Sequence, residues 1–461
     1  MPNFLAYAMM AMWPLFALII YKKFGAERAA ILVFLVPYLL LPEKTEIDLP
    51  LLPSIDKTAI IGLAAYFILK KHINKSLFFT NSSPIKFLLI LGFLTPAITV
   101  MNNTESLSFI EVEKPGLTWW DGVTYFIQYF SLIYAPFIVG YYLLSTPANQ
   151  RNILIFISTA GLIYLIPIAW EVRMSPQLHS NIYGFFPHDF RQQIRNGGFR
   201  PVVFLGHGLT VSAFMVSAFI AACVLMRQTP NFKYKFIPAK FAFIALLIGV
   251  ILCKSLGGLF IATFILVTLF FTSKNRQTSI ALFIGLILFS YPLIRDSATP
   301  ALDKISALIE AKNPDRAQSF SYRLNMETMI LDHANSKALT GWGSFGRNFV
   351  RDMNGNPISV PDGHWVLLLS TFGWLGYISI YGLLTFTVLK LRQHVKKQKD
   401  NSEHTYAIGL AMVLTATMID VIPNSSFSNM TMLLAGSLAG SILQGSGKSG
   451  RNLTPQNQNV S

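Results

Sequence analysis

The 461-residue chain has few charged side chains. Asp, Glu, Lys and Arg make up 13% of it, against about a quarter of an ordinary soluble domain. Hydrophobic residues reach 52%, and the mean hydropathy is +0.48. This scarcity of charge excludes an ordinary soluble globular protein and indicates that lipid surrounds most of the chain.

Cysteine is nearly absent as well. The sequence has two, Cys223 and Cys253, and both lie in or beside predicted apolar helices without C-x-x-C spacing. The sequence therefore predicts neither a disulfide framework nor a metal knuckle. The first apolar segment also lacks a small-residue cleavage site, so we expect it to be retained and not removed as a signal peptide.

Motifs for nucleotides and for metal-dependent sugar transfer are missing too. The glycines at 341–346 fit G-x-G-x-x-G, but that fingerprint needs a preceding strand in a βαβ unit, and a loop between apolar helices offers none. The segment 445–449 resembles a phosphate-binding loop, yet its required first glycine is Ile442. No Asp-x-Asp pair occurs. We therefore expect no metal and no cofactor, and we interpret 341–346 as a tight turn.

Apolar runs long enough to cross a hydrocarbon core, which takes about 20 residues as a helix, recur along nearly the whole chain. We predict an all-α polytopic membrane protein with about twelve or thirteen transmembrane helices; the run broken by Pro37 is the weakest. The runs are 4–20, 28–42, 57–70, 86–100, 120–144, 152–170, 200–226, 238–253, 257–272, 278–294, 365–390, 405–421 and 427–443.

Basic residues fall in alternate loops, as expected when the cytoplasmic loops carry the excess of Lys and Arg. The basic clusters lie at 22–28, 70–86, 227–240, 274–276 and 390–399. Acidic residues dominate the intervening loops near the amino terminus. This alternation predicts an external amino terminus and an internal carboxyl tail. The net charge of +15 then follows from topology and gives no support to nucleic-acid binding.

The polar stretches divide the chain into six predicted parts. These are an N-terminal transmembrane bundle at 1–170, a first periplasmic loop at 171–199, central transmembrane helices at 200–294, a large periplasmic loop at 295–363, C-terminal transmembrane helices at 364–443 and a cytoplasmic tail at 444–461. Long loops usually carry function, so we expect the chemistry in the large loop.

Within the large loop, the Asn-Pro-Asp segment at 313–315 has the form of a helix start, and the helix should run to about Ala334. Arg323 on this helix has two interpretations. It is either a solvated charge paired with Glu327 four residues further on or a functional residue.

Three further polar residues stand at predicted membrane helices. His364 should begin the helix after the large loop, near headgroup level, where the positive helix end favours a neutral imidazole and hence a proton acceptor; the alternative is a simple interfacial residue. Arg200 and His207 are seven apart and should share one face of the helix 200–226. Ionisable groups there usually face a cavity or partner, although His207 is alternatively a satisfied core histidine.

These motifs together resemble the O-antigen ligase and Wzy-type polymerase family. The resemblance rests on RPVVFLGH at 200–207, Arg323, GWG at 341–343, His364 and FGWLG at 372–376, and it covers about residues 195–385. It implies a GT-C-like fold with one large helical periplasmic loop. It also implies a metal-independent, inverting glycosyltransferase in the bacterial inner membrane, with its active site facing the periplasm.

The resemblance further implies partners and residue roles. The donor would be an undecaprenyl-pyrophosphate-linked glycan, and the acceptor a hydroxyl of a glycan, of lipid A core or of another molecule, with a chain-length regulator or flippase as a further candidate partner. Arg200 and Arg323 would bind the pyrophosphate and His364 would activate the acceptor. His207 adds to the substrate site, and Lys254 supplies the charge where relatives have Ser-Arg-Gly and this chain has Leu256.

The sequence is compatible with several functional hypotheses. The motifs do not encode the acceptor, so they do not distinguish a ligase from a polymerase. A lipid-linked oligosaccharide flippase or other secondary transporter is the alternative from a different class, although such proteins tend to show internal repeats and midplane charges, whereas here most polar groups lie in loops. A non-catalytic scaffold of an envelope assembly is a third option.

Overall fold

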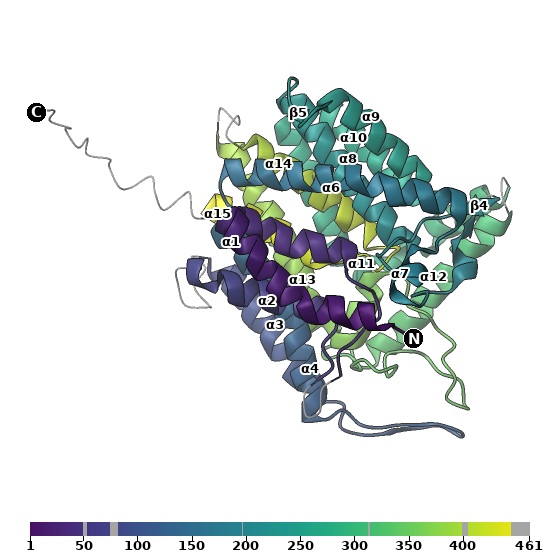
Figure 1. Ribbon diagram of the computed structural model, residues 1–461. Helices are drawn as coiled ribbons and strands as arrows, with labels where there is room; N and C mark the ends of the chain where they lie inside the picture. The colour runs from purple at the N-terminus through teal and green to yellow at the C-terminus, as the bar shows by residue number, and fades with distance from the viewer. Residues whose placement is uncertain (49–52, 74–81, 196, 312–313, 399–403, 444–461) are drawn as a thin grey trace, which may run out of the picture.

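The structure is a computed structural model that describes residues 1–48, 53–73, 82–195, 197–311, 314–398 and 404–443. The predicted cytoplasmic tail at 444–461 and residue 313 of the predicted helix start lie outside the described residues. Throughout the described ranges the chain is a bundle of α-helices (Figure 1).

Fifteen α-helices occur in the described ranges. They are α1 (Phe4–Leu40), α2 (Lys57–Leu69), α3 (Ser83–Met101), α4 (Trp119–Tyr129), α5 (Ala135–Leu143), α6 (Pro147–Met174), α7 (Leu178–Tyr183), α8 (Gly208–Gln228), α9 (Ala239–Leu252), α10 (Leu256–Phe271), α11 (Lys274–Glu310), α12 (Pro314–Asn335), α13 (His364–Lys397), α14 (Thr405–Asp420) and α15 (Asn429–Leu443). The longest connection between these helices runs from α12 to α13. A π-helical turn, η2 (Phe130–Tyr134), joins α4 to α5. Two short 3₁₀-helices are η1 (Lys70–His72) and η3 (Phe190–Gln193).

Strands contribute little to the described part of the chain. Three antiparallel hairpins have two residues per strand, and they lie in loops between helices. They pair β1 (Leu107–Ser108) with β2 (Glu113–Lys114), β3 (Ile194–Arg195) with β4 (Gly198–Phe199), and β5 (Lys233–Tyr234) with β6 (Ile237–Pro238).

The prediction of an all-α, multi-pass membrane protein is confirmed at this level. Seven helices of the described ranges are long and apolar enough to cross a membrane, and four more are apolar but shorter. Each predicted apolar run coincides with a helix, and the first two runs are the two parts of α1, which breaks at Gly25 (φ 74°). The exact number of crossings remains a prediction.

One end of the bundle collects most of the loops of interest. Figure 1 shows α7, β4 and α12 gathered at the end that also holds the amino terminus, and the Asn3 amide donates a hydrogen bond to the Tyr183 carbonyl there (2.9 Å). We call this the α7–α12 end. The hairpin β5–β6 connects α8 to α9 at the opposite end.

The predicted helix at 200–226 is wrong at its start, because α8 begins only at Gly208. The preceding residues form a tight turn in which Val203 (φ 50°) and Gly206 (φ 75°) are left-handed. The fully buried Glu171 carboxylate holds this turn by accepting the amide hydrogens of Val202 and Val203, both at 2.7 Å. The prediction that Arg200 and His207 share one helical face is therefore also wrong.

The predicted continuous helix at 365–390 is wrong as well. Helix α13 breaks at Gly373 (φ 60°, ψ −163°) into an N-terminal arm, 364–372, and a C-terminal arm, 374–397. His364 and Tyr381, 17 residues apart, are in hydrogen-bond contact, whereas a straight helix would separate them by about 25 Å. The N-terminal arm therefore folds back alongside the start of the C-terminal arm.

The break in α13 is held by backbone contacts with the loop that follows α12. The amides of Trp374 and Leu375 donate to carbonyls of residues 338 and 339, and the amide of Trp342 donates to the Ser370 carbonyl. A glycine is required at 373, since a Cβ atom there would lie 2.4 Å from the Leu339 carbonyl group.

Helices α14 and α15 are short for a membrane protein. They contain 16 and 15 residues, which is about 24 Å or less of helix, compared with a hydrocarbon core of about 30 Å. Almost every residue of α15 is buried by other helices. The turn between α14 and α15 meets His364, so the first residue of α13 lies within the bundle.

We expect Gly373→Ala to destabilise the protein by more than about 2 kcal/mol, because left-handed backbone and a steric clash add together. The measurement is thermal unfolding in detergent. Gly257→Ala is the control, since a Cβ atom at Gly257 has nothing within 4 Å. Equal melting temperatures for the two variants would contradict the break at Gly373.

Candidate functional site

His364 is the best-defined polar group at the start of α13. Its backbone amide donates to the carbonyls of Val421 (3.1 Å) and Asn424 (3.0 Å). Its ring lies parallel to that of Phe427, with 4.6 Å between centroids and 7° between planes. Nδ1 is 2.5 Å from the hydroxyl oxygen of Tyr381. These contacts fix the position and the plane of the imidazole.

The second ring nitrogen of His364, Nε2, has no hydrogen-bond partner among the residues that the structure describes. When Nδ1–H donates to Tyr381, Nε2 carries the lone pair and can accept a proton. His364 also lines a mostly apolar cavity of about 200 Å³. The arrangement therefore suits a neutral imidazole that meets a hydroxyl group within the bundle.

The turn that joins α14 to α15, residues 421–428, depends on a buried carboxylate. Asp420, 6% exposed, ends α14. It accepts hydrogen bonds from Asn424 Nδ2 (2.9 Å) and from Ser426 Oγ. Asp420 thereby positions the turn against His364, and we regard it as a structural support of the site.

Arg323 lies on α12, as predicted, but it does not pair with Glu327. Its Nε atom is 3.3 Å from a carboxylate oxygen of Asp362. Glu327 instead binds the buried Arg295 at 3.2 Å and accepts the indole N–H of Trp365 at 3.4 Å. The interpretation of Arg323 as one half of an i, i+4 pair is therefore wrong, because longer-range partners take both side chains.

The Arg323–Asp362 pair is linked to the first predicted loop through His188. Burial raises the pKa of the Asp362 carboxyl, while the positive charges of Arg323 and His188 oppose this shift. Burial and the charge of Lys44 lower the pKa of His188. The His188 ring packs against that of His207, with 4.6 Å between centroids. Asp362 of the large loop and His188 of the first loop are therefore within range of electrostatic interaction.

Arg200 and Lys254 lie together beside the start of α8. Arg200 is 8% exposed, and its Nη2 donates to the Lys254 carbonyl at 3.3 Å. The Arg200 stem packs against Gly208, where a Cβ atom would come within 2.2 Å of Cδ. Lys254 has a left-handed backbone (φ 48°), and its ammonium group lies against Gly198.

The five predicted site residues therefore fall into three adjoining groups at the α7–α12 end. Arg200 lies with Lys254, His207 lies with His188, and Arg323 lies with Asp362, two residues before His364. His207 also caps α8, since its Nδ1 accepts the Leu209 amide hydrogen at 3.1 Å. Arg323 makes no hydrogen bond to His364 in the described ranges.

Sequence reasoning gave no role to several residues around His364. Tyr381 and Phe427 approach it only because α13 breaks and the α14–α15 turn reaches it. The sequence could have indicated Asp420, because burying a carboxylate at the end of an apolar run costs free energy and such a group usually has a structural or functional role. Asp362 stood in a predicted loop, but its ion pair with Arg323 depends on the tertiary fold.

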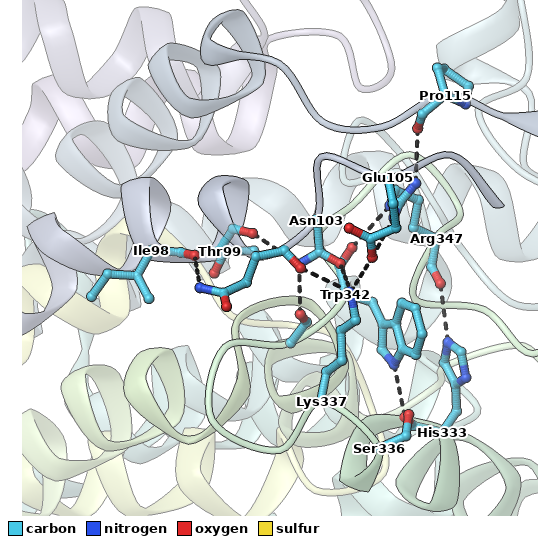
Figure 2. Close-up of polar contacts among 12 residues, drawn as sticks. Ile98, Thr99, Asn103, Glu105, Pro115, His333, Ser336, Lys337, Trp342 and Arg347 are labelled. Atoms are coloured by element: carbon cyan, nitrogen blue, oxygen red, sulfur yellow. Dashed lines mark hydrogen bonds and ion pairs between the residues drawn. The ribbon is translucent and has the colours of Figure 1, made fainter.

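A second polar cluster ties the loops of the α7–α12 end together, and we call it the loop clamp. Figure 2 shows Lys337, just after α12, reaching the loop after α3. Its ammonium donates to Asn103 Oδ1 (2.9 Å), to the Asn102 carbonyl (2.9 Å) and to the Glu105 carboxylate. The buried Arg347 donates to the Pro115 carbonyl at 2.9 Å in the same loop.

Aromatic contacts complete the loop clamp. The Trp342 indole stacks on His333, with 4.5 Å between centroids and 7° between planes, and donates to the His333 carbonyl at 2.8 Å. The Lys337 ammonium lies 4.5 Å from the Trp342 ring centroid. The predicted tight turn at 341–346 is confirmed, since Gly341, Gly343 and Gly346 all have positive φ. The clamp fixes the loop against which α13 breaks.

Comparison with known proteins adds no family assignment. No protein-family model matches the chain, and no curated protein matches it.

We expect the loop clamp to make stability depend on pH. The hydrogen bond from Lys337 lowers the pKa of the Glu105 carboxyl. A carboxyl with a lowered folded-state pKa stabilises the protein above its unfolded pKa of about 4.3, and this contribution is lost as the pH falls through the folded-state pKa.

Glu105→Gln should accordingly lower the stability near pH 7 by about 1 kcal/mol or less, as for other exposed pairs, and this difference should vanish below about pH 4. Thermal unfolding across this pH range provides the test. Glu111→Gln, an exposed position of the same loop, serves as the control. A Glu105→Gln difference that persists unchanged at low pH would contradict the ion pair.

Proposed function

We propose that this protein is a multi-pass glycosyltransferase of the bacterial inner membrane, of the O-antigen ligase and polymerase type. It transfers a glycan from undecaprenyl pyrophosphate to an acceptor hydroxyl in the synthesis of a surface polysaccharide. The observation that carries the proposal is the site itself. An oriented imidazole with an open Nε2 lines a cavity, and the guanidinium group of Arg323 pairs with Asp362, two residues before this histidine.

His364 acts as the general base in this proposal. Its Nε2 takes the proton of the acceptor hydroxyl as the oxygen attacks the anomeric carbon of the donor. The bond from that carbon to the pyrophosphate oxygen breaks, and the electron pair leaves with the pyrophosphate. The Tyr381 hydroxyl accepts a hydrogen bond from Nδ1–H of His364. This bond keeps the lone pair on Nε2 and stabilises the imidazolium that forms.

Arg323 and Arg200 supply positive charge for the leaving group. Guanidinium groups bind phosphate oxygens through paired hydrogen bonds and keep their charge at every physiological pH. Asp362 orients Arg323 when no substrate is bound, and the phosphate replaces or joins this carboxylate. His207 and Lys254 adjoin the same region and extend the polar surface for the donor.

The α7–α12 end faces the periplasm in this proposal. The two predicted periplasmic loops lie close enough there for His188 to lower the pKa of the Asp362 carboxyl. The hairpin β5–β6 at the opposite end belongs to a basic cluster at 227–240, as expected for a cytoplasmic loop.

Substitution of His364 should abolish catalysis without loss of the fold. We expect His364→Ala to lower the rate of transfer by about 10²- to 10⁴-fold, and Arg323→Ala to lower it similarly while Arg323→Lys retains part of the activity. The assay uses purified protein in liposomes with a lipid-linked oligosaccharide, with and without lipid A core. His394→Ala, at the other end of α13, is the matched control.

The products of this assay separate the alternatives. A ladder formed without core identifies a polymerase, and a single product that requires core identifies a ligase. Movement of the lipid-linked sugar across the membrane without a new glycosidic bond would favour a flippase. Unchanged transfer by His364→Ala would exclude it as the base.

The orientation can be tested with single cysteines. Met353 and Phe236 are 81% and 82% exposed at opposite ends of the bundle, and both natural cysteines are buried. We expect Met353→Cys to react with a membrane-impermeant maleimide on intact spheroplasts, and Phe236→Cys to react only after permeabilisation. The reverse pattern would place the candidate site in the cytoplasm and reject the proposal.

A further inference from the structure

The cavity beside His364 has a thin wall on one side. It lies between the two arms of α13 and the helix pair α3 and α4, with Tyr125, Tyr129, Pro96 and Phe372 among its lining residues. Its surface is mostly apolar. The helices α3 and α4 therefore separate this cavity from whatever lies behind them.

A second hollow lies on the other face of the same helix pair. This groove has a volume of about 600 Å³ and is lined by the parts of α3 and α4 nearest the α7–α12 end. Its lining includes Phe93, Val100, Met101, Trp119 and Phe126. Met101 and Trp119 are 75% and 65% exposed, so the groove opens to the surroundings of the bundle.

The groove and the cavity share a wall. Pro96 lines both hollows. Four residues form a small hydrophobic cluster, with Val100 and Leu117 on the groove side and Tyr125 and Phe372 on the cavity side. Phe372 also packs against the main core.

The backbone of this wall is irregular. Pro96 cannot donate the hydrogen bond that would tie it to Gly92, which weakens α3 at that turn. Helix α4 passes into the π-helical turn η2, a feature often found at functional sites. Gly122 leaves open space, since a Cβ atom there would meet only Val100, at 3.6 Å. Irregular backbone and open space therefore coincide on α3 and α4 beside the two hollows.

We propose that the groove binds the hydrocarbon chain of a lipid-linked substrate from the outer leaflet, and that its head group passes between α3 and α4 to His364. The inference rests on the proposed function. An apolar groove on a membrane-spanning helix pair suits a lipid chain. The stacked Trp119 and Trp120 rings, 4.0 Å apart at the start of α4, are typical of the headgroup level.

The four-residue cluster then acts as the gate of this route. The Tyr125 hydroxyl accepts the Ser344 amide hydrogen at 2.6 Å, and its ring packs edge-on against Phe372 at 5.2 Å. Ser344 belongs to the turn at 341–346, which the loop clamp holds. The gate is thus attached to the same loop that sets the break in α13.

Occupancy of the groove can be measured without catalysis. The probe is a polyprenyl phosphate with a photoreactive group on its chain and no sugar, in vesicles of phosphatidylethanolamine and phosphatidylglycerol. We expect labelling of α3 and α4, and at least a fivefold loss in Gly122→Phe, which fills the groove. Gly257→Phe is the matched control, because Gly257 also lies in the first turn of a helix, with open space around it.

Competition identifies the occupant. Unlabelled polyprenyl phosphate should abolish the labelling, whereas an equal excess of phosphatidylglycerol should not. Equal competition by both lipids would mean that the groove holds bulk lipid, and this would overturn the inference. So would unchanged labelling of Gly122→Phe.

A disulfide across the groove tests the route itself. An ideal Cβ atom at Gly122 lies 3.6 Å from Cγ2 of Val100, a position that the Sγ atom of a cysteine at residue 100 can occupy. Val100→Cys with Gly122→Cys should therefore link α3 to α4. We expect the oxidised form to lose at least 90% of transfer from a lipid-linked donor, and reduction to restore it. Full activity in the oxidised form would overturn the route and leave the proposed function intact. If the reduced form and the unmodified protein both fail to transfer glycan, the proposed function fails, and the labelling experiment still decides whether the groove binds a polyprenyl chain.

Discussion

Backbone N–H and C=O groups inside an apolar bundle must find partners within the protein, and the candidate site depends on how its non-helical segments meet this requirement. The turn before α8 is held by the Glu171 carboxylate, which accepts two amide hydrogens. The α14–α15 turn is held by Asp420 and gives two carbonyls to the His364 amide. These buried carboxylates let irregular backbone enter the bundle and bring polar side chains to one region.

The loops at the α7–α12 end form one structure with the start and the break of α13. The loop clamp joins the segment after α3 to the segment after α12 through Lys337 and Arg347. That second segment supplies the backbone partners of the residues that flank Gly373 and the amide that donates to the Tyr125 hydroxyl. The position of His364, the break in the helix and the wall of the cavity are therefore set by contacts between parts of the chain that are distant in sequence.

The sequence predicted the elements of this structure better than their junctions. Apolar runs located the helices, because hydrophobic length is a local property, and the helix that carries Arg323 was confirmed to Asn335. The predicted helix boundaries were wrong where contacts with residues distant in sequence outweigh the local hydrophobic pattern. The apolar residues at 201–205 predict a helix. They form a turn instead, because Pro201 has no amide hydrogen and the amides of the next two residues donate to the buried Glu171 carboxylate. Residues 372–376 look like continuous helix, but the loop at 338–340 occupies the space that a straight helix would need. Tyr381 and Phe427 could not be found at all, since no spacing rule connects them to His364.

The short helices α14 and α15 have a consequence for the shape of the membrane sector around the site. Both helices are shorter than the hydrocarbon core is thick. Because other helices surround them, neighbouring protein and not lipid fills the difference in length. The turn between α14 and α15 therefore lies inside the bundle, and it meets His364 there. In the proposed reaction, a sugar attached to a membrane-embedded carrier could stay near the depth of its own phosphates while the growing polymer extends into water.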